Sequence, residues 1–231
     1  MALTAANRMR QGNGRISLIN TLSAGLALGG IGVWSMHFIG MVALKLDVAT
    51  GYSMLETIVS LVAAILATAL ALLLVAKRPD HFPTLLGAGF MLGMGVVVMH
   101  YLGMFGMRFA GFIRWNFLVI GLSACIAVVA ATAALWLAFN TRTLGPRICA
   151  ALLMGVAVCS MHYTGMNAAE FVCTSANRVT PPSGLGVVNA LDLPSLVAAV
   201  ALCIAALISI DQFFQGADTK MRLARAAARA R

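Results

Sequence analysis

The chain consists largely of long apolar stretches separated by short polar segments, and this alternation limits the folds open to it. Crossing the roughly 30 Å hydrocarbon core of a bilayer takes about 20 apolar residues in a helix. Six stretches are long enough, at about residues 18–44, 54–76, 83–107, 115–139, 147–169 and 191–211. Because the hydrocarbon offers no water, each stretch must satisfy its own backbone hydrogen bonds as a helix. The sequence therefore predicts an all-α, polytopic transmembrane bundle of six helices.

The composition agrees with a chain that rarely meets water. Hydrophobic residues make up 61% of it and charged residues 10%, whereas a soluble domain typically carries about 25% charged residues. A net charge of +9 is compatible with a nucleic-acid partner. However, the basic residues lie between and after the apolar stretches, where topology determinants and contacts with anionic lipid belong. We therefore expect membrane lipid as a partner and no direct contact with nucleic acid.

The distribution of Lys and Arg predicts the orientation. With the N-terminus inside, twelve of these residues face the cytoplasm and four lie outside, which is a strong positive-inside bias. Both termini are therefore expected in the cytoplasm, with the first, third and fifth helices running outward. The predicted regions are a cytoplasmic N-terminal tail over residues 1–15, a transmembrane domain over residues 16–215, and a basic cytoplasmic tail over residues 216–231.

A short motif occurs three times and divides the six helices into three two-helix repeats. The segments 30–41, 93–104 and 155–166 align without gaps on the pattern G-x5-M-H-[FY]-x-G-M. Their histidines are 63 and then 62 residues apart, so each repeat holds one outward and one returning helix. Three of the four histidines occupy this position, and the fourth, His81, lies in a predicted turn.

Helical geometry suggests that the three histidines meet inside the bundle. A His at position i and a Met at i+4 lie on one helix face, and the motif glycines allow neighbouring helices to approach. Each histidine precedes a charged residue, Lys45, Arg108 or Glu170, by eight positions. Eight residues of helix correspond to about 12 Å. This spacing predicts three imidazoles at one level in the outer half of the membrane.

A polar side chain inside a membrane is costly and usually functional, and imidazole combined with thioether sulfur favours copper, especially Cu(I). The candidate ligands are His37, His100, His162, Met36, Met41, Met99, Met104, Met161 and Met166. Three alternatives stay open: a hydrogen-bonded bundle without metal, a haem-binding electron carrier or oxidoreductase, and a metal transporter. Because all carboxylates lie near predicted helix ends, we expect no catalytic residues and no enzyme activity.

The three copies of M-H-[FY]-x-G-M resemble the MHYT domain, an integral-membrane sensor module of bacteria. The resemblance runs from about residue 15 to 215 and implies a multi-pass protein of the bacterial inner membrane. It further implies copper held by the motif residues, which detects a diatomic gas (O2, CO or NO) or redox state. The signal would pass to a cytoplasmic output, for example one that makes or degrades cyclic di-GMP.

The chain departs from the family pattern in two respects. Family members typically have seven helices, whereas six are predicted here, and the additional one would precede Arg15. The first motif reads His37-Phe38 where tyrosine is usual. A tyrosine hydroxyl at that position is therefore available only from Tyr101 and Tyr163.

Overall fold

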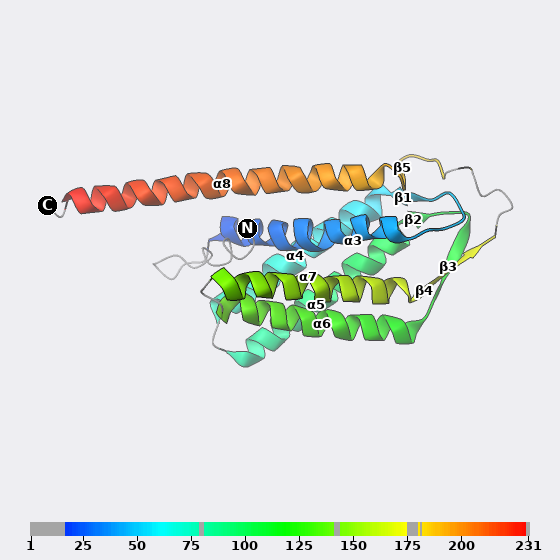
Figure 1. Cartoon of the computed structure of the whole chain (residues 1–231), viewed down its shortest axis with the longest axis horizontal. Coiled ribbons are helices and arrows are strands. Elements are labelled where there is room, and N and C mark those ends of the chain that lie inside the picture. Colours follow the sequence, from blue (N-terminus) through cyan, green and yellow to red (C-terminus); the bar gives the residue numbers. More distant parts are fainter. Residues whose placement is uncertain (1–16, 79–80, 141–143, 175–179, 181, 230–231) are drawn as a thin grey trace.

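The protein is a bundle of helices that lie along its long axis and carry short strands at one end (Figure 1). The computed structural model describes the chain apart from residues 1–16, 79–80, 141–143, 175–179, 181 and 230–231. Its helical elements are α2 (Leu18–Gly25), the π-helix η1 (Leu26–Trp34), α3 (Ser35–Gly40), the 3-10 turn η2 (Met41–Ala43), α4 (Met54–Lys77), α5 (Phe82–Phe105), α6 (Phe117–Asn140), α7 (Leu144–Met166) and α8 (Leu193–Arg229). The predicted all-α bundle is confirmed.

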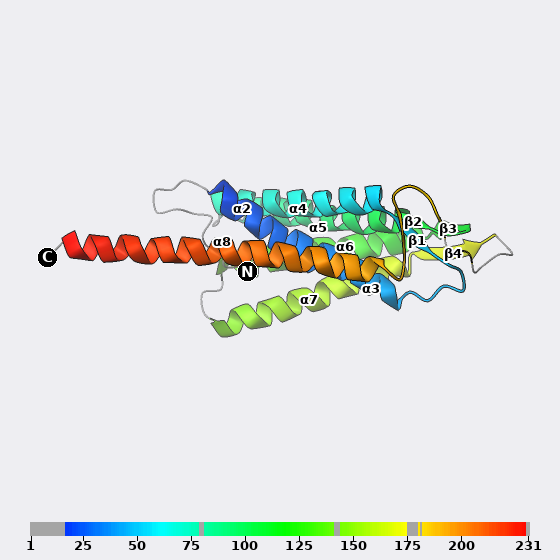
Figure 2. The same ribbon diagram turned by 90° about the horizontal axis from the view of Figure 1, so that it is seen from above.

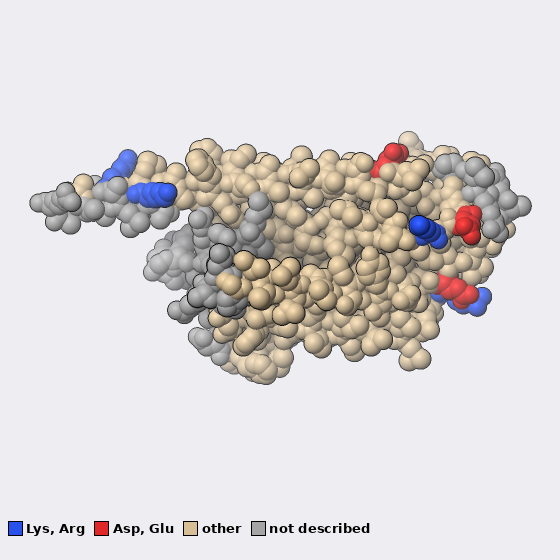
Figure 3. Space-filling view, viewed as in Figure 1, with Lys and Arg blue, Asp and Glu red and all other residues tan. Residues whose placement is uncertain are grey.

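The helices have the length and apolarity of membrane spans. In the described part of the chain, five stretches qualify: Leu18–Ala43, Met54–Lys77, Phe82–Phe105, Phe117–Leu137 and Leu193–Asp218. A sixth, in α7, contributes the shorter apolar segment Ala151–Met166. The visible face of the bundle carries charged side chains only towards its two ends (Figure 3). An uncharged belt between charged ends is typical of a multi-pass membrane protein, as the sequence predicts.

Short strands form a cap at the end of the bundle opposite to the end of α8 (Figure 1). The strands are β1 (Gly51–Ser53), β2 (Met107–Arg108), β3 (Gly111–Trp115), β4 (Ala169–Cys173) and β5 (Val187–Asn189). They make one antiparallel sheet of order β2-β1-β5 and one antiparallel pair, β3-β4. The sequence did not predict this cap, because most of its residues lie in the segments between the apolar stretches, where loops are expected.

The predicted helix ends need correction at this cap. α5 ends at Phe105 and α7 at Met166, so the predicted ends at 107 and 169 come too late. α8 begins at Leu193, so its predicted start at 191 comes too early. The excess residues, at 106–107, 167–169 and 191–192, form turns and the first residues of strands β2 and β4. Lys45, Arg108 and Glu170 thus lie beyond the helices, and the expected depth of about 12 Å, which assumed continuous helix, is wrong. His100 lies five residues before the end of α5, or about 7.5 Å of helix.

The predicted terminal regions are described to different extents. The predicted N-terminal tail, residues 1–15, lies outside the described residues. The basic region from residue 216 continues α8 as one helix to Arg229. In Figure 2 the C-terminal part of α8 extends past the other helices. α8 therefore continues from inside the bundle to beyond it as one unbroken helix.

The second helices of the first two repeats pack between the first helix of their own repeat and that of the next, whereas α8 packs mainly on the first repeat. α4 packs against η1 and α5, α6 packs against α5 and α7, and α8 packs against η1 and α3. Glycines allow the closest of these contacts, since a Cβ on Gly29 would lie 2.5 Å from the carbonyl oxygen of Ala64 in α4. The same segment, with its glycine pair, is wound as a π-helix. π-helical turns are rare and often occur at functional sites, and this one directly precedes the first motif histidine.

An ion pair joins the start of α4 to the cap, and it provides a test of this packing. Nη2 of Arg108 donates to Glu56 at 2.5 Å, and the Glu56 side chain is only 16% exposed. Arg114 and Glu170 are 3.5 Å apart and both more than 60% exposed. We expect Arg108→Ala to lower the free energy of unfolding by about 1–2 kcal/mol, because it removes a charge-assisted hydrogen bond from the partly buried Glu56.

The control for this prediction is Arg114→Ala, which removes an exposed pair worth about 0–1 kcal/mol. Thermal unfolding of the purified protein in detergent, followed by circular dichroism, measures both variants. Equal melting temperatures for the two variants would contradict the prediction.

Candidate metal centre

Three helices from three repeats each bring one histidine to the interior of the bundle. His37 lies in α3, His100 in α5 and His162 in α7. All three side chains are buried, with at most 1% exposure. The repeat explains this convergence, because equivalent positions on equivalent helices face the same axis.

The three imidazoles form a nearly equilateral triangle. Ring centroids are 4.8 Å apart for His37 and His100, 5.1 Å for His37 and His162, and 5.2 Å for His100 and His162. The rings stand at steep angles to one another, from 74° to 90°. The triangle confirms the prediction that these side chains meet at one level.

The Nδ1 atoms point into the centre of the triangle. Nδ1 of His37 lies 3.0 Å from Nδ1 of His100 and 3.2 Å from Nδ1 of His162. Each nitrogen of a neutral imidazole is either an N–H donor or a lone-pair acceptor, so Nδ1 of His37 can fully form only one of these two hydrogen bonds. Among the described His, Cys, Asp and Glu side chains, these three form the group whose ligand atoms lie close enough to hold a metal ion.

The Nε2 atoms point outward, and each lies against a motif glycine of another repeat. A Cβ on Gly40 would lie 2.7 Å from Nε2 of His162, and Cβ atoms on Gly103 and Gly165 would collide with Nε2 of His37 and His100. The contacts run in a cycle, because each histidine meets the glycine of the following repeat. The sequence predicted only that these glycines allow close helix approach.

All three Nε2 atoms are buried and make no hydrogen bond of good geometry with the described residues, although the backbone of Gly165 and Gly40 lies within reach of His100 and His162. Such groups are rare in native proteins and call for an explanation. A histidine that binds a metal through one nitrogen keeps the proton on the other, and neighbouring carbonyls often accept that proton. The glycines that face Nε2 lie in the last turn of their helices, where carbonyls lack the usual partner four residues on.

The spacing of the Nδ1 atoms fits one metal ion. Metal–nitrogen bonds of about 2.0–2.1 Å separate three nitrogens around one ion by about 3.3–3.6 Å. The observed separations of 3.0 and 3.2 Å are slightly smaller. A small outward movement of the rings would accommodate an ion, so the donor set fits a bound metal.

The six motif methionines do not share one environment. Met41, Met99, Met104 and Met161 are buried, whereas Met36 and Met166 are partly exposed. Met41 and Met99 pack in the apolar cluster around Phe38 and Val33, and Met161 packs with Val97 and Ala127. Their role as thioether ligands stays a prediction.

The aromatic residue after each histidine packs on its ring, at centroid distances of 4.7 Å for Phe38, 4.8 Å for Tyr101 and 5.1 Å for Tyr163. The three aromatic side chains differ in their exposure and in their hydrogen bonds. Phe38 is fully buried and Tyr163 is half exposed. The Tyr101 hydroxyl is 2.7 Å from Oγ of Ser123 in α6, so it is engaged outside the triangle.

A multi-pass helix bundle with three repeat-related histidines buried at one level is the class of membrane protein that this fold and site define. The family model MHYT, described as a bacterial signalling protein N-terminal repeat, matches residues 30–88, 93–151 and 155–226. The chain therefore belongs to the MHYT family, and it is a membrane sensor domain of that signalling family.

Three curated bacterial proteins show the family relationship along most of the chain. The bifunctional diguanylate cyclase/cyclic di-GMP phosphodiesterase MucR of Pseudomonas aeruginosa is 38% identical over 217 residues, which cover 90% of this chain and 31% of MucR. The cyclic di-GMP phosphodiesterase NbdA of the same organism is 32% identical, over 77% of this chain and 23% of NbdA. The signaling protein YkoW of Bacillus subtilis is 26% identical, over 81% of this chain and 24% of YkoW.

The chain thus spans less than a third of the length of these curated relatives. No solved structure matches it.

Proposed function

We propose that the chain is a sensor that binds a copper ion between its three motif histidines. The observation that carries this proposal is the convergence of three buried histidines, with Nδ1 of His37 3.0 and 3.2 Å from the Nδ1 atoms of the other two. His37, His100 and His162 would hold the ion, and the motif methionines Met36, Met41, Met99, Met104, Met161 and Met166 are the candidate additional donors. Soft thioether donors next to imidazole favour copper over zinc or iron.

Copper would supply reversible one-electron chemistry and affinity for a diatomic gas (O2, CO or NO), and we propose one of these, or the redox state, as the signal. The chain's own residues exclude water from the site, because the histidines and Phe38 are fully buried. They also fix the direction of each imidazole through the glycine contacts. A haem is less compatible, since three rings with centroids about 5 Å apart leave no space for a macrocycle.

α8 is the proposed route of the signal. Leu193 and Val197 at its start are buried in one cluster with Phe38, which follows His37. From this cluster, α8 runs as one helix to Arg229. A ligand can shift such a helix only if it binds two conformations of the protein with different affinities. These two conformations would differ at the contact between α8 and α3.

The proposed output is cyclic di-GMP turnover in the cytoplasm. The relatives MucR and NbdA are named for synthesis or degradation of this nucleotide. With both termini cytoplasmic in the bacterial inner membrane, as the positive-inside bias predicts, the end of α8 would face an output domain or partner protein. The match covers under a third of these relatives, so it does not extend to their enzymatic activities.

The metal content of the purified protein tests the proposal. The full chain, extracted from membranes in mild detergent, is expected to carry about one copper per polypeptide by inductively coupled plasma mass spectrometry. Its electron paramagnetic resonance signal should appear on oxidation and disappear on reduction. Stoichiometric zinc, or a strong Soret absorption from haem, would refute the copper assignment.

A further inference from the structure

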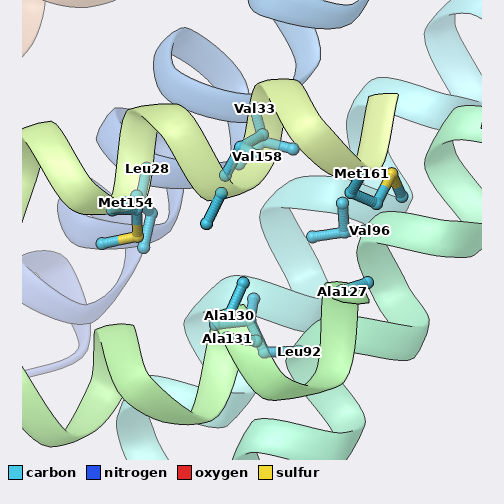
Figure 4. A pocket seen from close by; sticks show the side chains of 11 residues that line it. Leu28, Val33, Leu92, Val96, Ala127, Ala130, Ala131, Met154, Val158 and Met161 are labelled. Atoms are coloured by element: carbon cyan, nitrogen blue, oxygen red, sulfur yellow. The ribbon is translucent and has the colours of Figure 1, made fainter. Parts of the chain in front are cut away.

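A small apolar pocket lies between η1, α5, α6 and α7, on the side of the histidine triangle away from the strands. Figure 4 shows helices surrounding it on several sides, with side chains of each helix directed into it. Its lining residues are Leu28, Val33, Leu92, Val96, Ala127, Ala130, Ala131, Met154, Ala157, Val158 and Met161. Every one of them is aliphatic or a thioether.

The internal repeat relates this pocket to the histidines. Val33, Val96 and Val158 each stand four residues before a motif histidine. In the α-helices α5 and α7, residues four apart lie on the same face, and one turn is about 5.4 Å. Val33, near the end of the π-helix η1, lines the same pocket. The three equivalent valines therefore form a layer one turn from the histidine triangle, and the pocket lies along the same internal axis. Met161, directly before His162, also lines it.

Size and lining define what this pocket can hold. Its volume is about 30 Å³, whereas a single water needs about 10–15 Å³ by the same measure. Water also needs two to four polar partners, and apolar cavities stay dry and take up guests such as xenon. The pocket thus has room for a molecule of two or three atoms, and its chemistry selects an apolar one.

We propose that this pocket is a binding site for one small apolar gas molecule, a class that includes dioxygen and, as an experimental probe, xenon. The inference needs no metal, because it depends only on the pocket's size and lining. Where the proposed function also holds, the guest sits about one helical turn from the ion. The alanines on α6 are the residues that keep the space open, since a larger side chain at Ala130 would enter it.

Xenon binding to the full chain tests the inference. The protein, methyl-labelled at valine in lipid nanodiscs, is equilibrated with xenon at increasing pressure and followed by nuclear magnetic resonance. The methyl signals of Val33, Val96 and Val158 are expected to shift and saturate. Val129, which is 70% exposed on α6, should show only the non-saturating change caused by xenon dissolved in lipid.

Substitution of alanine by leucine provides the matched variants. Ala130→Leu is expected to abolish the saturable shifts, because the new side chain occupies the pocket. Ala133→Leu, at an exposed position on the same helix, should leave them intact. If Ala130→Leu lacks the wild-type circular dichroism spectrum, Ala157→Leu fills the same space from α7.

Two results would overturn the inference: wild-type protein without saturable valine shifts, or a correctly folded pocket-filled variant that binds xenon like wild type. Copper content, measured on the same samples, separates this result from the proposed function. Xenon binding in a protein without copper would support the pocket and refute the metal site. Bound copper without xenon binding would support the metal site and refute the pocket.

Discussion

Replacing His100 by alanine is expected to reduce bound copper to background. The imidazole of His100 is 1% exposed, and its Nδ1 lies 3.0 Å from Nδ1 of His37. Its loss would leave two of the three nitrogens and an opening of imidazole size beside the ion. Loss of a residue that only supports a ligand typically lowers metal affinity about 10–100-fold, so loss of a ligand should exceed that range.

The matched control is His81→Ala, which also removes a histidine. His81 is exposed, and its Nδ1 lies 2.9 Å from the Thr84 hydroxyl at the start of α5, away from the triangle. This variant should retain full copper content and lose only a helix cap, worth about 1 kcal/mol. Copper-to-protein ratios measured for wild type and both variants test whether His100 is a copper ligand. If His100→Ala binds as much copper as His81→Ala, the three-histidine site is refuted.

Replacing Gly103 by alanine is expected to weaken copper binding and destabilise the protein together. The added Cβ would collide with Nε2 of His37, and it would lie 2.9 Å from Cδ2 of that ring and 3.1 Å from Cζ of Phe38. Both side chains are fully buried, so neither has free space to enter. Overpacking of this kind costs about 1–3 kcal/mol, and the displaced imidazole would leave the centre of the triangle.

Gly87→Ala is the control on the same helix. A Cβ at Gly87 meets no other atom within 4 Å in the described structure. This variant should be neutral or gain up to about 1 kcal/mol from better helix propensity. Copper titration and thermal unfolding measure the pair, with an expected loss of about 10-fold or more in copper affinity for Gly103→Ala. Wild-type affinity and melting temperature in Gly103→Ala would show that the glycine does not position His37.

Much of the fold and the centre of the site were predictable from the sequence, because both depend on local patterns. The apolar stretches predicted the helices, and the triple motif predicted that three histidines share one level. The cap was not predictable in the same way. Phe112-Ile113 and Phe171-Val172 lie in segments between the apolar stretches, which the sequence predicts as loops because no alternating pattern long enough for a strand is present. Their pairing in β3 and β4 depends on partners more than 50 residues apart.

The sequence by itself determined that a membrane bundle of three repeats places His37, His100 and His162 at equivalent positions, because hydrophobic length and repeat spacing are properties of a chain read along its length. Only the tertiary structure decided that Nδ1 faces inward, that each Nε2 meets the glycine of the following repeat, and that a layer of valines leaves a pocket beneath the triangle. The physical reason is that a ring's direction and the space beside it depend on close packing against side chains from other helices. For the histidine rings, the facing histidines on the other helices lie more than 60 residues away along the chain.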